Sequence, residues 1–225
     1  PPAANTHIAT ISASYLNTYG PAIIQDGPGT YARKPTGTYL APGTIATVRV
    51  PLSMVGTGYR IRVGCHSWDF KAKPDIKRLD RVTRVYEIKA IDTKIASPLG
   101  GGIYIEVPFL AANGQVSVEI SNAVRSPFFS AKSFHQTTPA EWLTQRAHPA
   151  PWADFQSDKF MMQVPTSWIF NMPDPTQLMA DWDKAMDAVN DLMGYTAFNP
   201  GPNKYLSLIH ISEPTRLRRI SYAVF

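Results

Sequence analysis

The sequence predicts a mainly β protein of the α+β class, in which an antiparallel β-sandwich precedes a part that contains helices. Short runs that alternate apolar with polar residues follow one another from Thr44 to Ile120, without helices between them. Helical patterns begin only after Ser121, and 20 Pro with 14 Gly supply the turns that many short strands require. A chain of 225 residues is long enough to bury a core.

The predicted strands carry Val, Ile, Tyr or Thr at alternate positions. Ile8–Tyr15 fits either a first strand or a short helix. Gly and Pro predict breaks in the chain at 20–21, 26–29 and 34–37, and Asn113-Gly114 predicts a turn. Further strands are expected at Thr44–Pro51, Tyr59–Gly64, Val82–Ile91, Gly102–Pro108 and Gln115–Ile120.

A first helix is predicted after Thr138. This residue fits an N-cap and Glu141 follows three positions later, which is the spacing of a capping box. Pro149 and Pro151 end the helix, and one more strand is expected at Lys159–Val164.

A longer helix is predicted over Asp174–Met193, with Asp174 as its cap and Gly194 just beyond its end. Its apolar residues recur at steps of three and four, so they form one stripe that we expect to face the core. The stripe consists of Leu178, Trp182, Ala185, Met186, Val189, Leu192 and Met193. The opposite face carries several Asp, and we interpret it as solvated rather than as a metal site.

The stretch Tyr59–Phe70, YRIRVGCHSWDF, concentrates chemistry-bearing residues at the end of a predicted strand. It holds the one cysteine of the chain, Cys65, followed by His66, Trp68 and Asp69. We expect Cys65 and Trp68 to be structural, since a strand that runs into a turn often ends on residues that cap the core. His66 and Asp69 stay open between local backbone bonding and a functional role.

The composition favours a globular protein and argues against a transmembrane or nucleic-acid-binding one. Hydrophobic residues make up 44% and charged residues 17%, which suits a globular chain, and no apolar run approaches the roughly 18 residues of a transmembrane segment. The formal net charge is +5, but the last residues, 208–225, resemble translated sequencing-adaptor read-through and contribute +2, which leaves +3. With no Lys/Arg block, nucleic acid is not expected as a partner. The chain also opens without Met and is expected to be a piece of a longer protein.

A set of ordered motifs points to a known family. Gly37–Gly43 (GTYLAPG) precedes the strand TIATVRVP, then come RIRVGCHSWD and Gly100–Ile105 (GGGIYI), and later Ala150–Phe155 and the helix with Trp182. In this order and spacing the chain resembles the enhancin-like zinc metallopeptidases, peptidase family M60, which include bacterial mucin-degrading enzymes. The resemblance covers roughly residues 30 to 196.

The resemblance implies a lead-in at 1–35, a β-sandwich subdomain at 36–130, the start of a helical zinc-peptidase subdomain at 131–196, and a linker with a non-native tail at 197–225. It implies a secreted or cell-surface protein that acts on glycoproteins such as mucins or on their glycans. In the intact family protein an H-E-x-x-H helix binds zinc, because two His one turn apart face the same ion. The Glu between them activates a zinc-bound water.

This chain lacks that motif. Its five histidines, His7, His66, His135, His148 and His210, are never followed by Glu, and no two of them stand four residues apart. We therefore expect the fragment to bind no zinc and to be inactive alone, with the catalytic helix beyond Gly194. The sequence also lacks a G-x-S-x-G elbow, a phosphate-binding loop and a C-x-x-C pair.

Candidate substrate contacts come from the resemblance alone. They are Gly100, Gly101, Gly102, Tyr104 and Trp152. For the three glycines the alternative is a β-bulge or a close backbone approach. A second function also stays open, namely a non-catalytic β-sandwich module that binds carbohydrate or protein through exposed aromatic side chains. Its candidates are Tyr39, Trp68, Tyr104 and Trp152.

Overall fold

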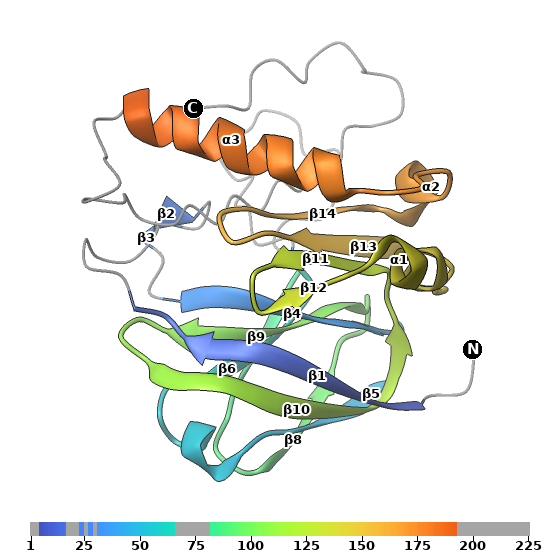
Figure 1. Cartoon of the computed structure of the whole chain (residues 1–225). Coiled ribbons are helices and arrows are strands. Elements are labelled where there is room, and N and C mark those ends of the chain that lie inside the picture. Colours follow the sequence, from blue (N-terminus) through green and yellow to red (C-terminus); the bar gives the residue numbers. More distant parts are fainter. Residues whose placement is uncertain (1–4, 17–22, 25–26, 29–30, 66–81, 193–225) are drawn as a thin grey trace, which may run out of the picture.

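A computed structural model describes residues 5–16, 23–24, 27–28, 31–65 and 82–192 (Figure 1). The fold is mainly antiparallel β with a few helices, as the sequence predicts. The elements are β1 (Asn5–Ser14), β2 (Ile23–Ile24), β3 (Gly27–Pro28), β4 (Tyr31–Leu40), β5 (Ile45–Arg49), η1 (Leu52–Met54), β6 (Arg60–Val63), β7 (Arg84–Glu87), β8 (Asp92–Ala96), β9 (Gly101–Pro108), β10 (Ala112–Arg125), β11 (Phe128–Lys132), β12 (His135–Gln136), α1 (Pro139–Gln145), β13 (Trp152–Gln156), β14 (Met161–Pro165), α2 (Thr166–Ile169) and α3 (Thr176–Leu192).

The larger sheet has the strand order β7-β6-β9-β4-β10-β5-β8, with β1 also paired to β10, and all of its pairs are antiparallel. Strand β10 joins β7, β6, β9 and β4 on one side to β5 and β8 on the other. Its residues 119–121 pair with β5, whereas its residues 124–125 pair with β4. The sheet thereby folds over a core to which β1, β4, β5, β6, β8, β9 and β10 all contribute buried side chains. Residues 8–14, left open between strand and helix, lie in strand β1.

The smaller sheet has the order β12-β11-β13-β14, in which β11 and β13 run parallel. It lies between the larger sheet and α3 (Figure 1). Its second core is aromatic: Phe129, Phe155 and Phe160 are fully buried, together with Trp142 of α1. The indole of Trp142 also donates a 2.9 Å hydrogen bond to the carbonyl of Met172, which fixes α1 against the chain that follows α2.

The predicted capping box of α1 is confirmed. The backbone N–H of Glu141 donates to the Thr138 hydroxyl at 3.2 Å, and the Glu141 carboxylate accepts from the Thr138 N–H at 2.7 Å. Pro139 occupies the first turn, where its missing N–H costs no intrahelical bond.

Strand β4 corrects the sequence analysis, which expected the chain to break at 34–37. It runs from Tyr31 to Leu40 between β9 and β10. Pro35 is still paired with Tyr104 of β9, and the pairing then shifts register before Tyr39, so Gly37 (φ +66°) lies in the irregularity. The Thr36 hydroxyl restores one lost contact by donating to the Ile103 carbonyl at 2.7 Å.

Helix α3 is confirmed within two residues at its N-terminus, where the Thr176 N–H donates to Asp174 at 2.9 Å. Its buried contacts are Met179 and Met186, while the ring of Trp182 stacks on Phe160 with 4.4 Å between centroids. The predicted stripe was too wide: the chain exposes Ala185 and Leu192, because one narrow line of the helix touches the sheet. Of the stripe, Met193 lies outside the described residues. Among the helices that the structure describes, none has the length and apolar character of a membrane span.

Candidate functional site

Four polar side chains meet between the two sheets, and we call them the junction cluster. They are Cys65 after β6, Tyr104 of β9, Asp154 of β13 and Gln163 of β14, with exposed fractions between 0% and 4%. The strand period of two explains their position. Ile103 and Ile105 enter the core of the larger sheet, so Tyr104 points from the opposite face toward the smaller sheet.

Hydrogen bonds connect the junction cluster across the two sheets. The Tyr104 hydroxyl donates to Oδ1 of Asp154 at 2.8 Å, and Nε2 of Gln163 donates to the same oxygen at 3.2 Å. The same amide donates to the Tyr104 hydroxyl oxygen, and the Cys65 thiol donates to Oε1 of Gln163. Oδ2 of Asp154 is buried and has no hydrogen-bond partner among the described residues.

Burial controls the protonation of the cluster. It raises the pKa of Asp154 to about 7, although the hydrogen bonds from Tyr104 and Gln163 act in the opposite direction. Burial also raises the pKa of Cys65 to about 12, with a further contribution from the Asp154 charge. The pKa of Tyr104 rises well above its ordinary value for the same two reasons. Near neutral pH the cluster therefore holds one group, Asp154, that is poised to titrate.

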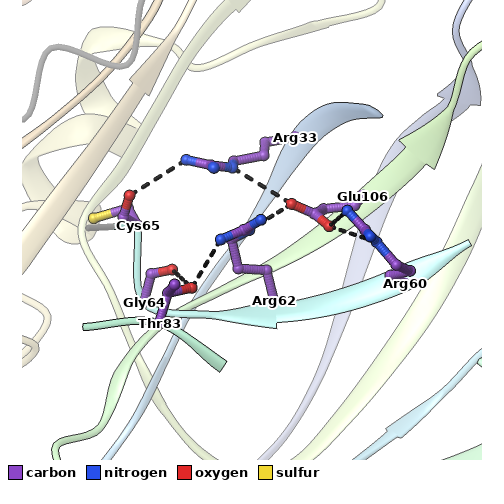
Figure 2. Close-up of polar contacts among 7 residues, drawn as sticks. All are labelled: Arg33, Arg60, Arg62, Gly64, Cys65, Thr83 and Glu106. Atoms are coloured by element: carbon purple, nitrogen blue, oxygen red, sulfur yellow. Dashed lines mark hydrogen bonds and ion pairs between the residues drawn. The ribbon is translucent and has the colours of Figure 1, made fainter. Parts of the chain in front are cut away.

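A group of charged side chains around Glu106 lies near Cys65 of the junction cluster (Figure 2), and Glu106 stands two positions after Tyr104 on β9, on the same face of the strand. Glu106 of β9, 1% exposed, accepts from Arg60 at 2.9 Å and from Arg62, and it lies 3.6 Å from the Arg33 guanidinium. The alternation in β6 causes this, because Ile61 and Val63 enter the core and leave the two arginines on the face of Glu106.

Arg33 links the two groups of side chains. One of its terminal nitrogens donates to the Cys65 carbonyl at 3.3 Å, while the guanidinium also contacts Glu106 (Figure 2). Arg62 reaches in the other direction, to the Thr83 hydroxyl at 2.9 Å, which in turn donates to the carbonyl of Gly64 at 2.9 Å. The arrangement fixes strands β4, β6 and β9 relative to one another. Sequence reasoning did not single out Arg33, Arg62 or Glu106. For Arg62 and Glu106 the available signal was their alternation with core residues, whereas Arg33 is followed by Lys34 and Pro35 and shows no such alternation.

The three glycines that the resemblance nominated lie where backbones approach closely. A Cβ on Gly100 would stand 2.4 Å from the Leu40 carbonyl oxygen, and one on Gly101 would stand 2.5 Å from the backbone nitrogen of Gly64. A Cβ on Gly102 would stand 2.8 Å from the Tyr104 hydroxyl. These distances account for the glycines by packing alone. A contact of this run with substrate stays a prediction.

The other candidate residues differ in how far they are exposed to solvent. Tyr39 and Tyr104 are buried, so the surface of the described chain does not display them to a ligand. Trp152 is half-buried at the start of β13. His66, Trp68 and Asp69 fall outside the described residues. Within the ranges that the structure describes, no three His, Cys, Asp or Glu side chains gather as metal ligands would.

We expect Cys65 to resist alkylation in the folded chain. Its side chain is buried and its pKa is raised to about 12, so at pH 8 almost no thiolate meets the reagent. Iodoacetamide should label the native chain at least about a hundredfold more slowly than the urea-unfolded chain. Since the sequence has one cysteine, intact mass spectrometry measures the rate without ambiguity. Equal rates in the two states would show that the junction cluster is open to solvent.

Comparison with known proteins matches most of the chain to two family models. The N-terminal domain of M60-like peptidases matches residues 21–121, and peptidase M60, enhancin and enhancin-like, matches residues 122–212. The junction cluster thus takes Cys65 and Tyr104 from the first matched segment and Asp154 and Gln163 from the second.

Among curated proteins, a TRPM8 channel-associated factor homolog from Xenopus laevis is 30% identical over 186 residues, 82% of this chain and 20% of that protein. The chain therefore spans about a fifth of the length of this relative. Among solved structures, the catalytic module of the metalloprotease ZmpA from Clostridium perfringens has a TM-score of 0.61 at 14% identity, covering 88% of this chain and 43% of that one. IMPa from Pseudomonas aeruginosa, solved with an O-glycopeptide, has a TM-score of 0.54 at 16% identity, covering 87% and 22%. Likeness at such identities shows the fold alone.

Proposed function

The chain belongs to the enhancin-like, M60-like peptidase family, and we propose that it is part of a zinc metalloendopeptidase that cleaves glycosylated proteins outside the cell, such as mucins. The observation that carries this proposal is the unbroken succession of two M60 matches over residues 21–212. The described fold supports it, since the sandwich and the sheet that follows resemble metallopeptidase structures over most of the chain.

The proposed substrate class rests on a neighbour. IMPa was solved in complex with an O-glycopeptide, and a protein that shares this fold can present a related binding face. On this chain the half-buried Trp152 is the candidate contact, because an indole ring can stack on a sugar while its other edge stays packed. The proposed location is secreted or cell-surface.

The residues present do not fit a zinc site. The sequence has no H-E-x-x-H, and none of its five histidines precedes a Glu. We therefore propose that this chain hydrolyses nothing alone. In the intact protein, the zinc-binding helix would follow the segment after α3.

Two experiments test the proposal. Extending the source DNA past the codon for Gly194 should reveal an H-E-x-x-H within several dozen residues. The purified extended protein should then cleave a mucin-type glycoprotein, lose activity on chelation, and leave the enzymatically deglycosylated substrate intact. The chain of 225 residues should cleave neither substrate. Cleavage by the short chain that stops on chelation would overturn its proposed inactivity.

A second candidate is a non-catalytic module that binds protein or carbohydrate. The observation that favours it is the 30% identity to a protein named as a TRPM8 channel-associated factor homolog, a name that describes association with a channel and no peptidase activity. A stop codon or a new domain without H-E-x-x-H in the extended gene would favour this candidate. Binding of the extended protein to a glycoprotein without any cleavage would agree with it.

A further inference from the structure

We propose that the junction cluster is a pH-sensitive contact between the two sheets, closed while Asp154 carries its proton and weakened when the proton leaves. The proposal goes beyond the proposed peptidase function and does not depend on it. It concerns how the two family-matched segments are held together, since each contributes two of the four side chains.

The hydrogen bonds of the cluster are the geometric basis. The bonds from Tyr104 to Asp154, from Gln163 to Tyr104 and from Cys65 to Gln163 all join the larger sheet to the smaller one. All four side chains are withdrawn from water, with Tyr104 at 0% and Asp154 at 1% exposure. The stability of a polar network that is shielded from water depends strongly on whether each polar atom in it has a hydrogen-bond partner.

Asp154 is the member that changes. Its Oδ1 accepts two hydrogen bonds, whereas Oδ2 is buried without a partner among the described residues. If Asp154 were ionised, it would bury a negative charge, and only Oδ1 would receive hydrogen bonds that stabilise this charge. Burying a charge with so few donors is energetically costly in a site without water. The neutral acid avoids that charge. Burial accordingly raises the pKa of this carboxyl to about 7, within the physiological range.

Among the described residues, no cation is a cause of the pKa shift of Asp154, although the charge of Arg33 acts on its neighbours Cys65 and Tyr104. On β4, Arg33 is held by Glu106 and the Cys65 carbonyl, and the adjacent Lys34 points to the opposite face of the strand. On β11, Lys132 lies four residues beyond Phe128, the partner of Asp154 in the parallel pairing. The sequences of β13, β14 and α2 contain no other charged residue.

The other titratable members of the junction cluster, Cys65 and Tyr104, stay neutral around pH 7. Cys65 and Tyr104 both have a raised pKa, so neither ionises near pH 7. Gln163 does not titrate. The charge of the cluster around neutral pH is therefore set by Asp154.

The sign of the effect follows from proton binding. The pKa of Asp154 is about 7 in the folded chain against 3.8 for an ordinary Asp, so the folded state binds more protons between these values. The stability contributed by this group is complete below about pH 4 and is lost as the pH rises toward 7. Above about pH 8 the carboxyl is ionised in both states, and the contribution no longer changes.

The test compares the full chain with Asp154→Asn, which keeps the shape and cannot ionise. Urea unfolding is measured from pH 5 to pH 8, and the unfolding equilibrium constant of the wild type is divided by that of the variant. This ratio should rise about tenfold between pH 5 and pH 6 and stop rising near pH 8. Taking the ratio cancels the titration of all other groups. A ratio that stays constant with pH would overturn the proposal.

Asp158→Asn is the matched control. Asp158 is exposed on the turn between β13 and β14, where it accepts from Ser133, so the same chemical change is made a few residues away outside the junction. Its ratio should vary less than about twofold over the same pH range. A control ratio that rises like that of Asp154→Asn would assign the effect to general charge and contradict the proposal.

Amide hydrogen exchange of the wild type gives a second readout that requires no variant to fold. After correction for the intrinsic rate, protection of β13 and β14 should fall between pH 5.5 and pH 8 more than protection of β5 and β8, which lie away from the junction. An equal change in all four strands would show that the junction does not loosen separately, and would overturn the proposal.

Discussion

Replacing Glu106 by alanine should lower the free energy of unfolding by about 3–5 kcal/mol, because it leaves buried guanidinium groups without their carboxylate. The side chains of Arg33 and Arg62 are only 7% and 10% exposed, and both face Glu106. Arg60, at 27%, can turn to solvent more easily. Urea unfolding followed by circular dichroism at constant pH and salt measures the loss.

Asp92→Ala is the control for this experiment. Asp92 also receives two hydrogen bonds from one arginine, Arg49, at 2.8 and 2.9 Å across paired strands. Both side chains are about half exposed, at 48% and 59%, so water replaces the lost partner. The expected cost is below about 1 kcal/mol. Similar costs for the two variants would show that the Glu106 pairs are no more desolvated than a surface pair.

Gly101→Ala should lower the free energy of unfolding by about 2–4 kcal/mol. The added Cβ would lie 2.5 Å from the backbone nitrogen of Gly64 and 2.6 Å from its Cα, and backbone atoms cannot rotate away as a flexible side chain can. The φ angle of +146° adds strain for any residue with a Cβ. Accommodating the methyl group would separate β9 from the end of β6, where the arginines and Cys65 are held.

Gly43→Ala separates the cost of the close backbone contact from the cost of the positive φ angle. Gly43 has a φ of +73°, but a Cβ there would meet no atom within 4 Å. Only the backbone strain applies, with an expected cost of about 1 kcal/mol. If Gly101→Ala costs no more than Gly43→Ala, close packing does not explain the glycine run. A role in substrate contact would then be the stronger explanation for those residues.

Local patterns predicted much of the fold. The alternation in 59–64 and 102–108 gave strands β6 and β9, and Thr138 with Glu141 gave the start of α1. These signals need only neighbours a few residues apart, so they survive without knowledge of the tertiary structure. The order of the turn and strand motifs also indicated the peptidase family, which the matches over 21–212 confirm.

Strand β4 was missed because Pro35 and Gly37 ordinarily break strands. Only the tertiary structure shows that a register shift and the Thr36 hydroxyl keep the sheet continuous around them. The width of the α3 stripe was misjudged for a related reason, since the sequence gives the apolar side of a helix but not how much of it touches a sheet.

The sequence by itself determined which side chains alternate along each strand and therefore which ones share a face. The tertiary structure decided what covers that face. Arg62 and Glu106 stand 44 positions apart, and Cys65 and Gln163 stand 98 apart, so their meeting depends on strand order and register. Because the smaller sheet packs over Tyr104, a face that alternation alone would assign to water becomes dry. That loss of water is what raises the pKa of Asp154 and makes the arginine pairs of Glu106 indispensable.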